Sequence, residues 1–321
     1  MQKDFELPRR GYLLVGLAAL LWAVSGSSAK FLFQGGLTPL QLVQVRVTLA
    51  AGLLLVWMVV KHPKLLRISR GDIIYFMALG AMMATVQFTY FMSISKIKVA
   101  AAILLEYLAP VFIAIHAAIF ARESLNRPTV LAVVGATVGC YLVVGGYNLD
   151  LLQLNRVGVI CGVISGLAFG GYSVYGERGM RTYHPWTVLF YALLFSAVPW
   201  NIAHPFWAPA PLPFEAFTRS YSLVEWGWIL YIALLGTIVP YGLYLAGINL
   251  IRSTRASITA TAEPILAGII SYIFLGESLD TLQLAGVALV IGSIIALQLK
   301  KEYDASTPDL IRARANATDP A

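Results

Sequence analysis

The chain contains one short pattern twice, as Phe120-Ala-Arg-Glu-Ser-Leu125 and again as Phe274-Leu-Gly-Glu-Ser-Leu279, 154 residues further on. The same shift aligns residues 75–125 with 229–279 without a gap and places Pro110 on Pro264. Two apolar helices can match by composition alone, but a shared proline and a shared helix ending are harder to obtain in that way. The pattern therefore predicts an internal duplication, which is the kind of self-similarity that decides a fold.

The composition excludes a water-soluble protein. Of the 321 residues, 59% are hydrophobic and 12% are charged, and the mean hydropathy is +0.75. A soluble domain carries about twice that charged fraction. One membrane crossing takes roughly 20 apolar residues. Ten apolar runs of about this length are present, at 11–33, 39–60, 72–95, 99–121, 128–146, 156–176, 186–204, 223–248, 256–275 and 281–299. We predict an all-α membrane protein with ten transmembrane helices, the eighth bent at Pro240.

Each copy of the duplicated unit contains five of the predicted helices. The first repeat covers residues 11–146 and the second covers 156–299, and a cytoplasmic tail follows at 300–321. Because five is odd, the second copy enters the membrane from the opposite side, as in an inverted-topology repeat. Such repeats place a substrate site near the bilayer midplane, at the interface between the repeats.

The distribution of lysine and arginine predicts the orientation in the membrane. Seventeen of the 23 basic residues fall in segments on one side of the predicted helices, and four fall on the other side. Basic residues collect in cytoplasmic segments, so both termini are expected in the cytoplasm. The net charge of +7 is thereby explained by topology, and we expect the lipid bilayer, rather than nucleic acid, as the partner of these residues.

These features resemble the drug/metabolite transporter superfamily, EamA type. The resemblance covers residues 11–299 and rests on two halves of five helices, on Pro39-x6-Arg46 and on the pattern P-x12-E-S-L at the ends of the fourth and ninth helices. It implies a multi-pass carrier in the bacterial inner (plasma) membrane, often an exporter of amino acids or other small metabolites.

Three charged residues lie deep within the predicted membrane helices. These are Arg46, Glu106 and Glu263. Each costs at least about 2.5–3.5 kcal/mol on insertion scales, so each is a functional hypothesis by default. A helical rise of 1.5 Å per residue places Arg46 and Glu106 roughly 10 Å below one face and Glu263 roughly 12 Å below the other.

Equal depth permits an ion pair between Arg46 and Glu106. This pair would fix packing alone, bind the carboxylate and ammonium of a substrate, or open as a gate. Both glutamates are candidates for proton coupling, because a buried carboxyl group can exchange a proton near neutral pH. The alternative for Glu263 is a proton held permanently by burial.

The other candidate substrate-binding residues are aromatic or hydrogen-bonding side chains within the helices, each of which could instead serve only in packing. They are Trp22, Gln87, Tyr90, Tyr107, Tyr172, Tyr241 and Tyr244. Pro110 and Pro264 are predicted hinges or walls of the site, because proline frees the carbonyl one turn earlier. A static kink is the alternative for both prolines.

Glycines at a spacing of four residues predict close packing between helices. They are Gly135 and Gly139, and Gly158, Gly162, Gly166 and Gly170. Charged residues near helix ends are predicted to have structural roles. The side chains of Lys30 and Glu177 can extend to the membrane–water interface. Glu123 and Glu277 are expected to anchor helix ends outside the substrate site.

The sequence thus predicts a secondary transporter for a small organic metabolite, preferably an amino acid, that works by alternating access around a central cavity. The ATP-binding pattern G-x4-G-K-S/T is absent, so direct use of ATP is not expected. No cofactor, metal site or catalytic residue is predicted, and no oligomeric state. Two alternatives stay open: a passive facilitator or channel of the same fold, and a membrane enzyme, which would need a nucleophile with a positioned base.

Overall fold

The computed structural model describes residues 3–109, 111–112, 127–203 and 222–304, which are mostly helical and contain no strand. The α-helices are α1 (Lys3–Gln34), α2 (Pro39–Lys61), α3 (Ile73–Lys96), α4 (Val99–Glu106), α6 (Arg127–Val143), α7 (Leu149–Met180), α8 (Pro185–Ala203), α9 (Leu223–Ala233), α10 (Val239–Ala260), α11 (Ala262–Leu275) and α12 (Thr281–Asp304). Short 3-10 turns, η1 (Pro63–Leu66) and η2 (Arg70–Asp72), connect α2 to α3, and η3 (Leu234–Ile238) is a π-helix between α9 and α10. Each of the ten predicted segments therefore carries helix.

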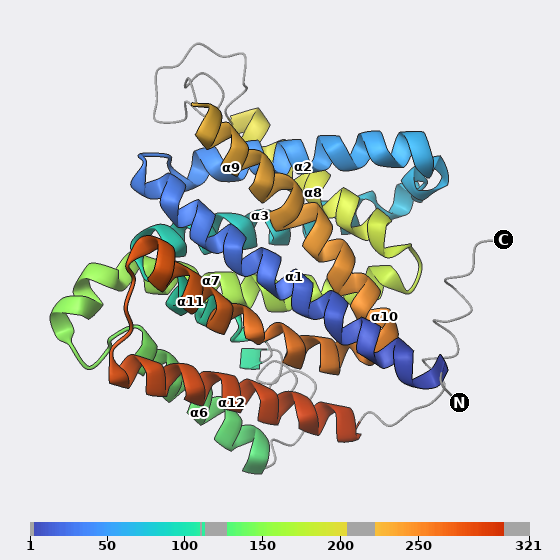
Figure 1. Cartoon of the computed structure of the whole chain (residues 1–321). Coiled ribbons are helices and arrows are strands. Elements are labelled where there is room, and N and C mark those ends of the chain that lie inside the picture. Colours follow the sequence, from blue (N-terminus) through green and yellow to red (C-terminus); the bar gives the residue numbers. More distant parts are fainter. Residues whose placement is uncertain (1–2, 110, 113–126, 204–221, 305–321) are drawn as a thin grey trace.

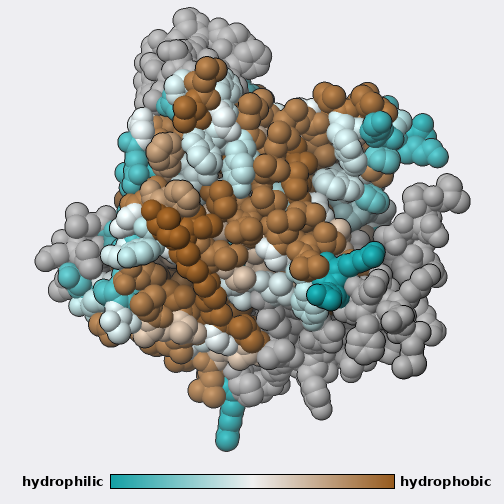
Figure 2. All heavy atoms as spheres, viewed as in Figure 1, coloured by the Kyte–Doolittle hydropathy of each residue, from teal (hydrophilic) through white to brown (hydrophobic). Residues whose placement is uncertain are grey.

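The helices have the length and composition of a multi-pass membrane protein. Six described stretches are long and apolar enough to cross a bilayer: Arg9–Gln34, Pro39–Lys61, Arg70–Lys96, Asn155–Met180, Pro185–Ile202 and Leu223–Gly247. Shorter apolar helices accompany them at Val130–Val143, Ala262–Leu275 and Thr281–Ala296. Figure 2 shows apolar side chains over the centre of one face, while hydrophilic residues gather towards its edges.

Helix α1 lies between α10 and α11 and packs against both (Figure 1). Helix α3 packs against α7 and α8, and α6 lies beside α12. Figure 1 also shows that α1 begins and α12 ends at the same end of the molecule, whereas the loop between α11 and α12 lies at the opposite end. Elements from the two ends of the sequence are thereby interleaved through the bundle.

Local sequence signals explain where several helices begin. Thr38 caps α2, with reciprocal hydrogen bonds to Gln41, and Pro39 fills the first helical position. Ser222 and Glu225 form the same capping box at the start of α9. Such boxes satisfy amide groups that have no partner within the helix, so these boundaries follow from residues adjacent in the sequence.

Two predicted helix boundaries are wrong. The expected loop at 249–255 is helical, since α10 continues to Ala260 and the break comes at Thr261. The expected fourth helix does not run on unbroken from residue 99, because α4 ends at Glu106 and a turn follows. The first of these boundaries is wrong because the charged residues at 252–255 lower the local hydropathy but do not interrupt the backbone hydrogen bonds of the helix.

Proline explains where the breaks fall. A proline lacks the amide that would bond the carbonyl four residues earlier, and for Pro110 and Pro264 these carbonyls belong to Glu106 and Ala260, the last residues of α4 and α10. Pro264 accordingly lies in the first turn of α11 rather than in the middle of a helix. The predicted hinge at Pro110 lies outside the described residues.

Three helices are longer than their apolar runs. Helix α1 begins at Lys3 rather than at residue 11, α7 begins at Leu149 rather than at 156, and α12 ends at Asp304 rather than at 299. Hydropathy detects only the segment that lipid can surround, and backbone hydrogen bonds continue beyond it.

The glycines at 135 and 139 form a packing seam with α12. A Cβ atom on Gly139 would lie 2.9 Å from the carbonyl oxygen of Gly286, and one on Gly286 would lie 2.7 Å from the carbonyl oxygen of Gly139. Because backbone atoms meet backbone atoms at this crossing, no side chain fits on either glycine.

Candidate functional site

Arg46 is buried in the bundle, with 4% of its surface exposed, and donates hydrogen bonds to the π-helix η3. Its Nε lies 2.7 Å from the Thr237 hydroxyl, and its Nη2 lies 3.2 Å from the Gly236 carbonyl oxygen. The guanidinium carbon also lies 4.8 Å from the centre of the Phe91 ring. Arg46 is thereby held by polar and cation-π contacts at once.

The local sequence of η3 supplies the groups that hold Arg46. Pro240 has no amide to bond the Gly236 carbonyl, so that carbonyl is available to Arg46. The Thr237 hydroxyl accepts from Arg46 and donates to the Ile232 carbonyl at 2.8 Å. A Cβ on Gly236 would lie 2.3 Å from the Ser25 hydroxyl, so glycine lets α1 approach closely here. The π-helix, a feature frequent at functional sites, thus ends two residues before Pro240, where a bend is predicted.

Glu106 binds a different partner from the one expected. Its carboxylate accepts a hydrogen bond from the Ser165 hydroxyl on α7. Among the described ion pairs there is none between Glu106 and Arg46, although the two groups lie near enough to interact electrostatically. The guanidinium instead donates to the Gly236 carbonyl and to the Thr237 hydroxyl of η3.

Glycines of α7 bring Ser165 to Glu106. A Cβ on Gly166 would lie 2.6 Å from the Leu105 carbonyl oxygen, and one on Gly162 would lie 2.5 Å from the Leu105 side chain. Gly162 and Gly166 of the predicted glycine row therefore pack against α4, and Gly158 packs against Lys96 and Ile97 at the end of α3.

We expect Gly166→Ala to lower the stability of the protein, because backbone of α4 cannot yield to the added methyl group. Overpacking of this kind costs about 1–3 kcal/mol, measurable as a lower midpoint of thermal unfolding in detergent. Gly171→Ala on the same helix is the matched control, because its Cβ would meet only the Met82 side chain at 3.7 Å. Equal midpoints for the two variants would contradict the packing described here.

Tyr107 joins the two helix breaks. It lies in the turn after α4, and its hydroxyl lies 2.8 Å from the Ala260 carbonyl oxygen and 2.9 Å from Glu263 Oε2. Glu263 is 6% exposed, in the first turn of α11. The carbonyl released at the end of α10 and the buried carboxyl group thus share one hydroxyl.

Three aromatic rings from α1 and α10 lie against one another beside these groups. The Trp22 ring centre lies 5.2 Å from that of Tyr241, in an edge-on arrangement, and 5.5 Å from that of Tyr244. Tyr241 and Tyr244 are one turn apart on α10 and therefore present the same face. The rings offer apolar surface with polar hydroxyl groups at its rim.

The structure brings most of the predicted site residues together. Electrostatic proximity links Arg46, Tyr90, Glu106, Tyr107, Tyr172, Tyr241, Tyr244 and Glu263, and Trp22 joins them through its ring contacts. We call these nine residues the central cluster. Gln87 has a different surrounding: its amide nitrogen lies 3.4 Å from the Met83 sulfur on its own helix.

Sequence reasoning missed Ser165, Thr237 and the Gly236 carbonyl as partners of the cluster. A signal for two of them was present, because Thr237 stands three residues before Pro240 and Ser165 stands inside the glycine row. From the sequence alone, a small polar residue at such a position cannot be distinguished from one that only packs between helices. Within the described part of the chain, no group of acidic, histidine or cysteine side chains could hold a metal ion.

Two stretches of the chain, residues 9–145 and 156–298, match the model of the EamA-like transporter family. The inner membrane transporter YicL of Salmonella typhimurium, described as uncharacterized, is 29% identical over 91% of this chain and 96% of its own length. The threonine/homoserine exporter RhtA of Escherichia coli is 25% identical over 89% and 88%. The pseudopaline exporter CntI of Pseudomonas aeruginosa is 25% identical over 92% and 99%.

A solved crystal structure shares the fold. It superposes with a TM-score of 0.58 at 19% identity and covers 92% of this chain and 99% of its own.

Proposed function

Because the chain belongs to the EamA-like transporter family, we propose that it is a secondary transporter that exports an amino acid or a related small metabolite by alternating access. Its relatives are named as transporters and exporters, and these are not enzymes. The observation that carries the proposal is a cluster of charged and aromatic side chains, buried in an apolar helical bundle, whose hydrogen bonds join one half of the chain to the other.

Among the described residues, the hydrogen bonds of the cluster cross between the two halves. Arg46 in the first half binds Gly236 and Thr237 in the second. Glu106 accepts from Ser165. The Tyr107 hydroxyl, in the first half, contacts the Ala260 carbonyl and the Glu263 carboxyl group, both in the second half. In transporters built from inverted repeats the substrate site lies at the interface of the repeats, and a substrate that displaced these bonds would change how the halves fit.

The positions of the helix breaks support the duplication. Helix α4 ends at Glu106 and α10 ends at Ala260, which are 154 residues apart, the shift that aligns the two repeated segments. The copies differ at the preceding connection, because a turn separates α3 from α4 whereas α10 is continuous there. We infer an inverted repeat whose broken helices face the site, with both termini in the cytoplasm.

The chemistry of the cluster suits an amino acid. Arg46 can bind a carboxylate, Glu106 or Glu263 can bind an ammonium group, and the rings of Trp22 and Tyr241 can cover a side chain. The name of the relative RhtA, a threonine/homoserine exporter, favours the same substrate class and the outward direction.

Proton coupling is the energy source that we propose, and Tyr107 supports it. A tyrosine hydroxyl has one proton to donate but contacts two oxygen atoms, Ala260 O and Glu263 Oε2. If the hydroxyl donates to the carbonyl, the contact with Glu263 is satisfied by a proton on the carboxyl group. The titratable groups that face Glu263 are Glu106 at the end of α4, Tyr107 in the turn after it, Tyr90 on α3, and Tyr241 and Tyr244 on α10.

Transport in proteoliposomes tests the proposal. Vesicles that contain the purified protein are loaded with radiolabelled threonine, homoserine or a mixture of other amino acids, and release is followed with and without an imposed pH gradient. We expect release that the gradient accelerates and that protein-free vesicles lack. A passive facilitator would equilibrate the substrate at the same rate with or without the gradient, and absence of release for every amino acid would overturn the substrate class.

Glu106→Gln is expected to reduce the transport rate, because the neutral amide loses the charge that attracts an ammonium group. Glu225→Gln is the matched control, since Glu225 caps α9 away from the cluster and glutamine serves equally in a capping box. We expect a loss of about tenfold or more for Glu106→Gln, equal to about 1.4 kcal/mol, and little change for the control. Wild-type rates in both variants would remove Glu106 from the site.

A further inference from the structure

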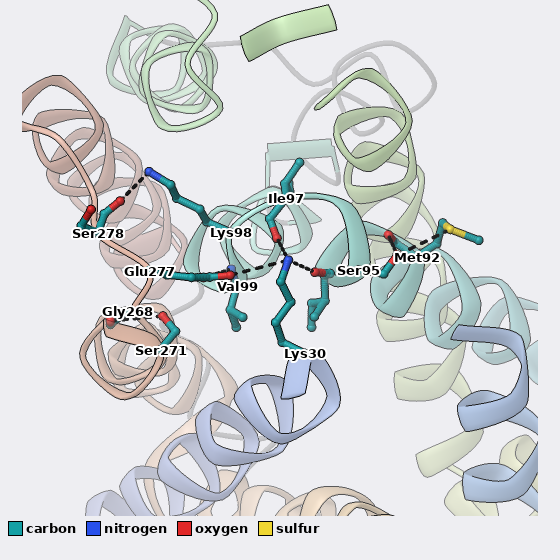
Figure 3. A network of polar contacts seen from close by, with 11 residues as sticks. Lys30, Met92, Ser95, Ile97, Lys98, Val99, Gly268, Ser271, Glu277 and Ser278 are labelled. Carbon is teal, nitrogen blue, oxygen red and sulfur yellow. Dashed lines mark hydrogen bonds and ion pairs between the residues drawn. The ribbon is translucent and has the colours of Figure 1, made fainter. Parts of the chain in front are cut away.

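Lys30 on α1 caps the end of α3. Its Nζ lies 2.8 Å from the carbonyl oxygen of Ile97 (Figure 3) and 2.8 Å from that of Ile94. Carbonyl groups at the end of a helix lack partners within the helix and carry the negative end of its dipole. A lysine ammonium group is therefore well placed to satisfy them.

Glu277 caps the start of α4 from the opposite half of the chain. Its Oε2 accepts a hydrogen bond of 2.9 Å from the Val99 amide, the first residue of α4, and its Oε1 lies 3.6 Å from Lys30 Nζ. The side chains of Lys30 and Glu277 are 12% and 14% exposed. The expectation that Glu277 anchors a helix end is confirmed, and the helix is α4 rather than its own. Glu123, the equivalent residue in the first copy, lies outside the described residues.

A second lysine connects the α3–α4 turn to the segment that follows α11. Lys98, in the turn between α3 and α4, donates to the Ser278 carbonyl and, at 2.7 Å, to Gln283 Oε1. Gln283 in turn donates to the Val143 carbonyl at the end of α6, at 3.0 Å. We call Lys30, Lys98, Val99, Glu277 and Ser278 the clamp.

The backbone of the loop before α12 fixes Glu277 in place. Gly276 ends α11 in the left-handed region, at φ 68°, and the amides of Gly276 and Glu277 both donate to the Ser271 carbonyl. Further along, hydrogen bonds from the Tyr147 hydroxyl and the Gln283 amide lower the pKa of Asp280. A charged Asp280 at neutral pH therefore stays bonded to both and holds the loop against the first half.

We propose that Lys30 and Glu277 are the gating residues of transport at the end of the molecule opposite the start of α1, and that their separation opens this end. This inference rests on the proposed alternating access. The clamp joins α1, α3 and α4 of the first half to Glu277 and Ser278 of the second, so the halves cannot part here while it holds. With both termini in the cytoplasm, this end faces outwards.

The surroundings of Lys30 allow the clamp to open and close. A cleft of about 390 Å³ reaches Lys30. It is lined by Lys30, Phe33, Gln34, Gly36, Leu37, Thr38, Pro39, Ser95 and Lys96. Because water can reach the ammonium group through this cleft, the charges that separate on opening are solvated again. Because the separated charges can be hydrated in this way, the contact between Lys30 and Glu277 can break and form again in every cycle.

The test measures access to a buried position behind the clamp. Ala100 on α4 is 3% exposed, and its Cβ lies 3.6 Å from where a Cβ on Gly268 of α11 would be. Ala100→Cys is introduced after Cys140→Ala and Cys161→Ala, and labelling by a membrane-impermeant maleimide is timed in right-side-out vesicles without substrate. Lys30→Met and Glu277→Gln are compared with Lys96→Met, the matched control, since Lys96 lines the same cleft but is exposed.

We expect Lys30→Met and Glu277→Gln each to raise the labelling rate about threefold and Lys96→Met to leave it unchanged. Glutamine keeps an oxygen for the Val99 amide, so Glu277→Gln carries the test if Lys30→Met does not fold. Equal rates in all variants, or a rise seen only in inside-out vesicles, would overturn the outward gate. Because labelling needs no substrate, raised labelling with no transport would reject the proposed substrate alone, and transport with unchanged labelling would reject the gate alone.

Discussion

Glu263→Gln is expected to abolish accumulation driven by a pH gradient while leaving substrate exchange across the membrane in place. Glutamine has the size of a protonated glutamate and can still bond the Tyr107 hydroxyl, 2.9 Å from the native carboxyl oxygen. It cannot release a proton, so a carrier that depends on Glu263 for coupling becomes an exchanger. The measurement is release against a substrate gradient, with and without the pH gradient, beside exchange of labelled for unlabelled substrate at equilibrium.

Tyr107→Phe is the companion variant for this prediction. It removes the hydroxyl shared by Ala260 and Glu263 but leaves the carboxyl group, so transport should slow while its response to the pH gradient persists. A Glu263→Gln protein that still accumulates substrate under the gradient would show that the proton is carried elsewhere. Loss of both accumulation and exchange would instead make Glu263 part of the substrate-binding surface.

Arg46→Met is expected to reduce transport by about a hundredfold or more, because the substrate carboxylate that we assign to Arg46 would lose two hydrogen bonds from a charged donor, each worth about 1.5–3 kcal/mol. Gly236 O and the Thr237 hydroxyl would lose their donor, and both belong to the π-helix that leads into α10. Arg46→Lys should restore little, because an ammonium group cannot reproduce the fork of the guanidinium. Transport rates and the thermal midpoint are measured together.

Thr237→Val separates the two roles of Arg46. The substitution removes the partner of Arg46 Nε and the 2.8 Å bond to Ile232 but keeps the guanidinium. If Arg46 binds the substrate carboxylate, Thr237→Val should lower the thermal midpoint with little change in KM, whereas Arg46→Lys should raise KM. Parallel losses of stability and unchanged KM in both variants would limit Arg46 to packing.

Much of the site was predictable because the bilayer restricts what an apolar helix contains. A charged residue within such a helix is costly, so Arg46, Glu106 and Glu263 stand out without any structure. The helix breaks were implicit in the prolines, since the residues that end α4 and α10 are those whose carbonyls lose a donor. The boundary near residue 252 was wrong because hydropathy reports the cost of burial and not the continuity of backbone bonds.

The sequence alone determined the class of protein, the helical segments, the ionisable residues within them and the places where proline interrupts a helix. These depend on residues that are neighbours in the chain. Only the tertiary structure decided which groups meet: Arg46 binds η3 rather than Glu106, Glu106 binds Ser165, and Glu277 binds Val99 and Lys30. Several acceptors at similar depth satisfy a buried donor equally well, and the choice among them is made by how closely the helices pack.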